Sequence, residues 1–494
     1  MRDLIRDDSL KISGAVKWSS FTEILAKLVS PITNMILARI LSPESFGIVT
    51  TVTMVISFVD IFTDAGFQRY LVQHQFKNNE EMDRHTNVAF WTNLSISLLL
   101  WYLIALYSDG IANLVGNPGL GNVIAIACIS LPLTSFSSIQ MALYRRSFNY
   151  KTLFYVRIIG ICLPFIITIP LAILGGGYWA LILGTISGNL CNAILLTINS
   201  PWKPKLFYEF DILREMLSFS MWSLMEALSI WLTTWIGTFI VATKISSYYL
   251  GLYKTSMNMV NSLMSIVTGA TTPILFAALS RYQEDDIQFQ KTLFKFQRLV
   301  SAFVIPLGVG IFIYRDFATN FLLGEQWEEA SLLVGLWGLT SSFSIVLANY
   351  CSEVFRSKGK PKLSFLSQII HLVFLIPTCL YSANYGYETL VYMRSFIRIQ
   401  FIITQLLLMR FIIKIPIMKM IKNIFPFILS SLGMTLIAIY LRNLSSGFLW
   451  SFCSIIISIM IYFCMIFTFP QVRNEFLELI PENLELKKII YKKA

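Results

Sequence analysis

The sequence predicts an all-α polytopic membrane protein with about fourteen transmembrane helices, and three observations lead to this fold class. Of the 494 residues, 55% are hydrophobic and only 14% are charged, whereas soluble globular proteins carry roughly 25% charged residues. The mean hydropathy is +0.65. Apolar runs of the length that crosses a hydrocarbon core as a helix, about 20 residues, recur along the whole chain, and Lys and Arg gather on alternate sides of them.

The apolar runs are separated by short polar stretches, and the three glycines at 175–177 form one complete connection. Such connections leave no room for a soluble catalytic domain. The predicted spans are 13–41, 46–68, 86–107, 120–144, 153–174, 178–198, 216–243, 248–279, 296–314, 331–354, 363–382, 386–409, 421–441 and 447–469.

Basic residues orient these spans. Residues 1–14 contain acidic side chains and lack a small-residue cleavage site, which argues against a cleaved signal peptide and favours a cytoplasmic N-terminus. Counted from there, 31 of the 39 Lys and Arg residues fall on the inner side. This pattern predicts a multi-pass protein of the inner (cytoplasmic) membrane with both termini in the cytoplasm. The net charge of +11 then fits anionic lipid head groups and predicts no nucleic-acid partner.

Cysteine and histidine predict neither a disulfide framework nor a metal site. The seven Cys residues lie within or at the ends of spans without a C-x-x-C spacing, as expected of small apolar side chains. His74, His85 and His371 are too dispersed in the sequence to form a ligand set. We therefore expect no metal and no cofactor.

An internal repeat divides the chain into lobes. An ungapped offset of 204 residues places Trp18 on Trp222 and Gly47 on Gly251, and aligns the first span with the seventh. Because six spans intervene, both copies have the same orientation, which predicts two six-helix lobes related by an axis along the membrane normal. The predicted parts are an N-terminal lobe at 1–205, a C-terminal lobe at 206–412, two further helices at 413–470 and a cytoplasmic tail at 471–494.

Several motifs resemble one membrane family. The hairpin from Trp18 to Gln73 contains LARILSPESFG, which ends at Gly47, and then DAGF, which includes Asp64 and Gly66. RRSFNYKTL, LGEQWEEA and FRSKGKPKLSF follow in order further along the chain. Over essentially its whole length the sequence resembles the polysaccharide transport family of the multidrug/oligosaccharidyl-lipid/polysaccharide exporter superfamily.

This resemblance implies a fourteen-helix flippase that works by alternating access. Its substrate would be an undecaprenyl-diphosphate-linked oligosaccharide repeat unit of lipopolysaccharide O-antigen, capsule or exopolysaccharide. The chain would be a transporter and not an enzyme, with glycosyltransferases or a polymerase as partners. Two alternatives stay open, namely an ion-coupled multidrug antiporter of the same superfamily and a membrane glycan polymerase or glycosyltransferase. The short outer loops and the parallel repeat weigh against the enzyme.

Basic residues inside the spans are candidate phosphate ligands, because a charge at bilayer depth costs about 2.5–3.5 kcal/mol on insertion scales and needs a partner. Arg394 and Arg398 stand four residues apart, hence on one helix face, and guanidinium forks suit phosphate oxygens. The alternatives are an ion pair to carboxylates in another helix and, for Arg394, a side chain that extends to the outer membrane interface. Lys254 is a weaker candidate for the same role.

Four further charges are candidates for the substrate cavity or for ion coupling. Glu23 and Lys27 have the favourable spacing of an intrahelical pair, whereas Glu226 has no Lys four residues later. Asp60 lies deeper in its span than Asp64, which we assign to the family-like turn. Coupling to a proton or sodium gradient through Asp60 and Glu226 is a further hypothesis.

Other polar or aromatic side chains within the spans have two readings each. Trp231 and Trp235 fit core packing better than stacking on sugars, and Glu353 with Arg356 predicts a local ion pair. Amide groups either contact sugar hydroxyls or bridge helices. The amide candidates are Gln140, Asn189, Asn192, Asn258 and Asn261.

Overall fold

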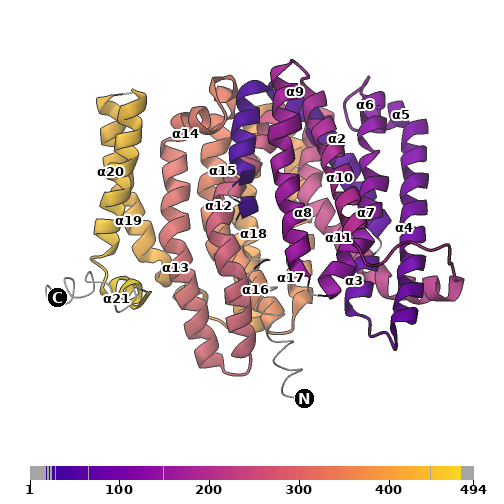
Figure 1. Cartoon of the computed structure of the whole chain (residues 1–494). Helices are drawn as coiled ribbons and strands as arrows, with labels where there is room; N and C mark the ends of the chain where they lie inside the picture. The colour runs from indigo at the N-terminus through magenta and orange to yellow at the C-terminus, as the bar shows by residue number, and fades with distance from the viewer. Residues whose placement is uncertain are drawn as a thin grey trace. The chain divides into compact units, whose positions relative to one another are not determined.

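In the computed structural model the described chain is helical, and no strand occurs within it (Figure 1). The described residues are Trp18, Thr22, 25–27 and 29–479, except 65, 148 and 446. Glu23 lies outside them, so its predicted pairing with Lys27 stays a prediction. The side chains at 64, 69, 218–223, 226, 270 and 476–479 also lie outside the described part of the structure. The side chains of Asp64, Trp222 and Glu226 are among them.

The fold class is confirmed. Within the described residues twelve helices are long and apolar enough to cross a membrane, or thirteen when the bent pair at 247–281 counts as one span. Each coincides with a predicted span, and a helix at 29–40 occupies the end of the first predicted span. The spanning helices are α2 (Pro43–Asp64), α4 (Asn79–Leu106), α6 and α7 (Gly121–Ala127, Ser130–Arg146), α8 and α9 (Tyr150–Leu163, Ile169–Ile173), α10 (Tyr178–Asn199), α11 (Phe210–Lys244), α12 (Ser247–Arg281), α13 (Asp286–Ile313), α15 and α16 (Ser331–Ser344, Tyr350–Ser357), α17 (Pro361–Ala383), α18 (Tyr387–Leu408), α19 (Ile417–Leu444) and α20 (Phe448–Ile466).

Two compact units make up the chain, and each is described by itself. The first comprises Met1–Ser262, Leu323–Trp327 and Leu375–Leu390. The second comprises Leu263–Leu322, Glu328–Phe374 and Val391–Ala494. These units follow local packing and do not test the lobe boundaries at 205 and 412, which stay a prediction.

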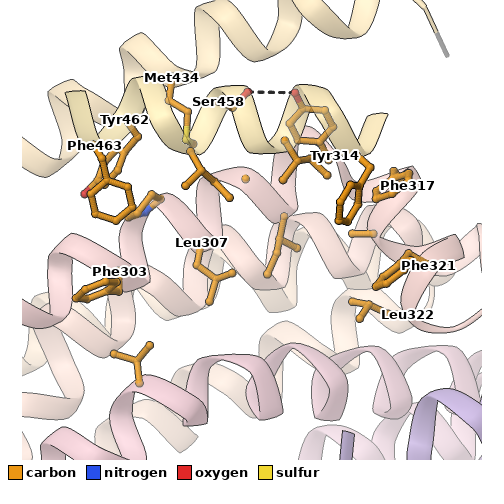
Figure 2. A pocket seen from close by; sticks show the side chains of 18 of the residues that line it. Phe303, Leu307, Tyr314, Phe317, Phe321, Leu322, Met434, Ser458, Tyr462 and Phe463 are labelled. Atoms are coloured by element: carbon orange, nitrogen blue, oxygen red, sulfur yellow. Dashed lines mark hydrogen bonds between the residues drawn. The ribbon is translucent and has the colours of Figure 1, made fainter. Parts of the chain in front are cut away.

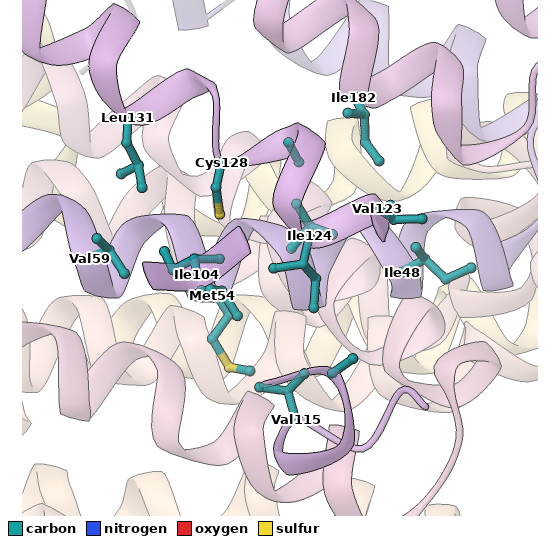
Figure 3. Close-up of a cluster of buried hydrophobic side chains, with 14 residues drawn as sticks. Ile48, Met54, Val59, Ile104, Val115, Val123, Ile124, Cys128, Leu131 and Ile182 are labelled. Atoms are coloured by element: carbon teal, nitrogen blue, oxygen red, sulfur yellow. The ribbon is translucent and has the colours of Figure 1, made fainter. Parts of the chain in front are cut away.

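An apolar cluster forms a core of the first unit, where α2, α4, α6, α7 and α10 meet (Figure 3). Met54 and Ile104 lie within it, and Cys128 is fully buried there as a small apolar side chain. Trp231 and Trp235 of α11 pack against the cluster, which confirms the packing interpretation for both. Because lipid tails are as apolar as these side chains, close packing and not water exclusion favours the contact.

The glycines related by the repeat, Gly47 and Gly251, lie against each other in the first unit. A Cβ atom on Gly47 would stand 1.7 Å from the Ser247 carbonyl oxygen, and one on Gly251 would stand 1.8 Å from that of Pro43. Pro43 and Ser247 are themselves 204 residues apart. The contact is therefore symmetrical, as two helices related by a two-fold axis would make it, and it leaves no space for a side chain.

Two of the family-like motifs also contact each other in the first unit. Trp327 is fully buried, and its Nε1 donates to the Ala38 carbonyl oxygen at 2.7 Å. Gln326 Nε2 donates to the Leu41 carbonyl oxygen at 2.9 Å. The carbonyl groups at the C-terminal end of the helix at 29–40 have no N–H donors within the helix, and these side chains supply the missing donors. Phe46 completes the contact, with its ring centroid 5.3 Å from that of Trp327.

Helices approach closely in the second unit as well. A Cβ atom on Gly308 of α13 would stand 2.6 Å from the Gly338 carbonyl oxygen of α15, so small residues are needed at this crossing. Arg298 of α13 joins the C-terminal helix α21 (Pro470–Leu479) through a bidentate pair with Glu475, in which Nε lies 2.7 Å from Oε2. Arg298 also donates to Asn423 of α19.

Candidate functional site

A polar cavity of about 410 Å³ lies among α2, α4, α7, α10 and α11 in the first unit. Most of its lining residues carry a hydroxyl or an amide group, and Asp60 is the ionisable residue among the described ones that line it. The lining residues are Ser57, Asp60, Ile61, Thr63, Gly66, Gln68, Asn93, Thr134, Ser135, Ser137, Ser138, Met141, Asn189, Asn192, Leu224 and Ala227.

Asp60 is exposed to this cavity, and neutral groups are its partners. Its Oδ1 accepts hydrogen bonds from Thr63 Oγ1 at 3.1 Å and from Thr134 Oγ1 at 3.4 Å. Within the described residues no Lys or Arg reaches it at ion-pair distance. The charge therefore relies on hydroxyl groups and on the polar cavity, which leaves the carboxylate accessible to a cation or a proton.

The predicted amides divide into two groups. Asn189 and Asn192 line the polar cavity and are half-buried, and their side-chain amides make no hydrogen bond within the described chain. Gln140 is fully buried, and its Nε2 lies 2.9 Å from Thr197 Oγ1, so it bridges α7 and α10. Asn258 and Asn261 are exposed on α12. The amides of α10 are thus the ones that a hydroxyl-rich ligand in the cavity would meet.

Lys254 of α12 lies over an aromatic ring of α11. Its Nζ is 4.1 Å from the Trp235 ring centroid, a cation–π contact. Trp231, one turn earlier on α11, donates from Nε1 to Ser57 Oγ at 3.0 Å. The first unit therefore carries both this lysine and the Asp60 cavity.

The predicted arginine pair lies in the second unit and converges on one indole ring. Arg398 Cζ is 3.4 Å and Arg394 Cζ is 5.0 Å from the ring centroid of Trp337 in α15. The Trp337 residue is buried, with 1% of its surface exposed. Arg398 also donates to Ser341 Oγ, one turn further along α15. A desolvated cation–π contact is worth about 2 kcal/mol, so the indole stabilises both guanidiniums. Phosphate binding by the pair stays a prediction.

The predictions for Glu353, Arg356 and the three histidines are confirmed in part. Glu353 and Arg356 form the predicted local ion pair, with Oε1 and Nη2 3.4 Å apart. Contrary to the expectation from sequence separation, His74 and His85 lie together, with ring centroids 5.7 Å apart. A turn between α3 (Phe67–Gln73) and α4 brings them into contact, which linear spacing does not reveal. His371 belongs to the second unit, where its Nδ1 lies 2.9 Å from Gln400 Oε1.

One sequence signal for the polar cavity lies outside the predicted site residues. The segment Thr134–Ser138 in the fourth predicted span carries four hydroxyl residues within five positions, and all four line the cavity. In a spanning helix such a density of hydroxyl groups indicates a surface that faces other helices or water and not lipid.

An apolar pocket of about 470 Å³ lies in the second unit, between α13, α14 (Arg315–Leu322), α19 and α20 (Figure 2). Phe303, Leu307, Phe317 and Phe463 contribute to a lining that is almost entirely hydrocarbon. The Tyr314 hydroxyl lies 3.3 Å from Ser458 Oγ, so this polar group is engaged by its neighbour (Figure 2). The pocket suits an apolar chain.

Comparison with known proteins identifies the family. A family model described as "Polysaccharide biosynthesis protein" matches residues 36–332, more than half of the chain. The chain belongs to this polysaccharide biosynthesis protein family. The family resemblance predicted from the hairpin and the later motifs is thereby confirmed.

Curated relatives of this family member include a membrane protein and two proteins named for succinoglycan or lipopolysaccharide biosynthesis. A Klebsiella pneumoniae protein described as an uncharacterized membrane protein in the cps region is 22% identical over 379 residues, 76% of each chain. The succinoglycan biosynthesis transport protein ExoT of Rhizobium meliloti (strain 1021) is 24% identical, over 66% of this chain and 65% of its own. The lipopolysaccharide biosynthesis protein WzxC of Escherichia coli (strain K12) is 20% identical over 74% of each.

Solved structures show the same fold. The lipid II flippase MurJ in an inward closed conformation has a TM-score of 0.74 and 16% identity, covering 92% of this chain and 99% of its own. An inward-facing MATE family multidrug resistance transporter of the MOP superfamily has a TM-score of 0.59 and 13% identity, covering 83% and 98%. The polysaccharide biosynthesis protein thus has the fold of these transporters.

Proposed function

We propose that this protein is a flippase that moves a polyprenyl-diphosphate-linked oligosaccharide repeat unit across the cytoplasmic membrane, for the biosynthesis of a surface polysaccharide. The observation that carries the proposal is the family match over residues 36–332. Relatives named as a succinoglycan transport protein and a lipopolysaccharide biosynthesis protein support the same substrate class. The chain is on this proposal a transporter and not an enzyme.

The polar cavity of the first unit fits the glycan. Sugars present many hydroxyl groups, and Asn189 and Asn192 offer amides that other described side chains do not occupy. The hydroxyls of Thr134–Ser138 add donors and acceptors to the same cavity. Such groups exchange hydrogen bonds with water for hydrogen bonds with sugar at little net cost, which suits a ligand that must be released.

Cationic side chains fit the diphosphate. Arg394 and Arg398 are held by Trp337 and Ser341, so their rotamers are pre-organised and less entropy is lost when they bind phosphate oxygens. In the first unit, Lys254 over Trp235 is a separate candidate for a phosphate group. The apolar pocket of the second unit, lined by side chains such as Phe317 and Phe463, fits a polyprenyl tail.

Topology and energy coupling are part of the same proposal. The excess of Lys and Arg on alternate connections supports both termini in the cytoplasm, and substrate would enter from that side. The accessible Asp60 carboxylate supports coupling to a proton or sodium gradient. Glycosyltransferases and a polymerase would supply and consume the repeat unit.

An ion-coupled multidrug antiporter is a second candidate, favoured by the fold shared with the MATE transporter. The lining of the Asp60 cavity argues against it, because cavities that accept drugs are predominantly apolar and aromatic.

Reconstituted vesicles test the proposal. Purified protein is placed in liposomes whose outer leaflet carries a polyprenyl-diphosphate oligosaccharide with a fluorescent glycan, and loss of fluorescence accessible to an external quencher reports flipping. We expect flipping with wild-type protein and none in protein-free vesicles. If the wild-type protein flips the substrate no faster than protein-free vesicles do and exports a cationic dye, the multidrug antiporter becomes the better proposal.

A further inference from the structure

Three potential metal ligands converge near the end of α3 (Phe67–Gln73) in the first unit. They are His74, which follows α3, His85 of α4 and Glu215 of α11. His74 Nε2 lies 3.9 Å from Glu215 Oε1, and His85 Nε2 lies 3.9 Å from Glu215 Oε2. All three ligand atoms lie within 4.8 Å of one another.

The orientation of His85 leaves a nitrogen lone pair aimed at this point. Its Nδ1 is 2.9 Å from the Glu81 carbonyl oxygen, which only accepts, so in the neutral ring Nδ1 carries the proton and Nε2 offers a lone pair. The residue is 5% exposed, and Nε2 is a buried atom with no hydrogen-bond partner in the described chain. Leaving such an acceptor unsatisfied costs about 1–3 kcal/mol, which a bound cation would offset.

Neighbouring groups fix the other two ligands. The Tyr70 ring stacks on His74 with centroids 4.6 Å apart, and its hydroxyl donates to Glu215 Oε1 at 2.8 Å. Arg146 donates to the His74 carbonyl oxygen at 2.6 Å, which anchors the backbone of the turn. Supporting contacts of this kind orient the ligands of metal sites and tune their affinity.

We propose that His74, His85 and Glu215 form a binding site for a divalent transition metal, with Zn²⁺ as the cation that fits best. Two imidazole nitrogens and one carboxylate oxygen are a zinc ligand set, and three protein ligands leave a fourth position for water. The exposed side of the cluster provides access, because the Glu215 and His74 side chains are 55% and 29% exposed.

The distances require an adjustment. Ligand atoms bound about 2.1 Å from one tetrahedral zinc lie roughly 3.4 Å apart. The two 3.9 Å contacts involve different oxygens of Glu215, and with one oxygen the three ligand atoms lie within 4.8 Å of one another, so the longest separation must shorten by about 1.4 Å. Rotation of the partly exposed Glu215 and His74 side chains would supply this shift. A bound metal would connect α3, α4 and α11, and it would therefore stabilise this end of the first unit.

Metal binding by the full-length protein in detergent, free of any histidine tag, tests the proposal. After chelator treatment and desalting, ZnCl₂ is titrated by calorimetry and bound zinc is counted by mass spectrometry; CoCl₂ absorption reports the coordination geometry. We expect one zinc per chain, a tetrahedral cobalt spectrum and a higher melting temperature with zinc. His74→Ala and Glu215→Gln should each weaken zinc binding at least tenfold.

Glu209→Gln is the matched control, since Glu209 pairs with Arg84 near the start of α11 and is no member of the cluster. It should bind zinc as the wild type does. His74→Ala and Glu215→Gln change partly exposed residues, so they keep the test valid should His85→Ala fail to fold. Wild-type protein without stoichiometric zinc, or Glu215→Gln with wild-type affinity, would overturn the site. Neither result depends on transport activity.

Discussion

The contact between Gly47 and Gly251 predicts a large effect for a single methyl group. Gly47→Ala would place Cβ 1.7 Å from the Ser247 carbonyl oxygen and 2.7 Å from its carbonyl carbon. Ordinary contact begins at about 3.4 Å, so α2 and α12 must separate by about 1.7 Å. Both sides of the contact are backbone, and no flexible side chain is available to move away.

The cost follows from what this separation disturbs. Extra atoms in a packed core typically cost about 1–3 kcal/mol, and we expect the upper end here because the clash is with backbone. The bridge formed by Asn117, which donates to Thr51 Oγ1 at 3.0 Å and accepts from Ser247, would also be strained. Gly251→Ala should cost a similar amount, because Pro43 opposes it at nearly the same distance.

Thermal unfolding in detergent, followed by tryptophan fluorescence, and flipping in vesicles are the two assays. Both single variants should lower the melting temperature by several degrees and reduce flipping. The double variant should cost less than the sum, because both methyl groups separate the same two helices. Gly188→Ala is the control, since nothing lies within 4 Å of its Cβ and alanine favours a helix. Wild-type stability and flipping in Gly47→Ala would refute the contact.

Three further outcomes are expected. Arg398→Ala removes the guanidinium that lies over Trp337. It should lower the rate of flipping of a diphosphate-linked substrate at least tenfold, which corresponds to about 1.4 kcal/mol. A wild-type rate in vesicles would show that Arg398 is not part of a phosphate site. Asp60→Asn keeps the hydroxyl contacts but removes the charge, so flipping should lose its response to an imposed proton or sodium gradient; an unchanged response would exclude this carboxylate from coupling. Arg298→Ala leaves Glu475 without its bidentate partner and should destabilise the protein by about 3 kcal/mol, measured as a lower melting temperature, while an unchanged value would show that α21 contributes little.

The spans could be predicted from the sequence because bilayer thickness fixes helix length, so hydropathy and the placement of basic residues carry the information. The pairing of Arg394 with Arg398 on one face followed from helical spacing in the same way. Contacts that depend on a turn could not be predicted. Nothing in the spacing of His74 and His85 shows that α3 and α4 return them to one point, and their partner Glu215 is 130 residues further along the chain.

The position of Asp60 gives a physical basis for linking substrate to an ion. Its carboxylate is held by two hydroxyl groups that can accept as well as donate, and by a cavity of neutral polar groups. A sodium ion or proton bound there removes the unpaired charge, and glycan hydroxyls entering the same cavity replace the water that otherwise solvates it. Because both occupants act on the solvation of one carboxylate, each changes the affinity of the other by the same factor. On this proposal, binding of the ion and binding of the glycan are therefore linked through the cavity that they share.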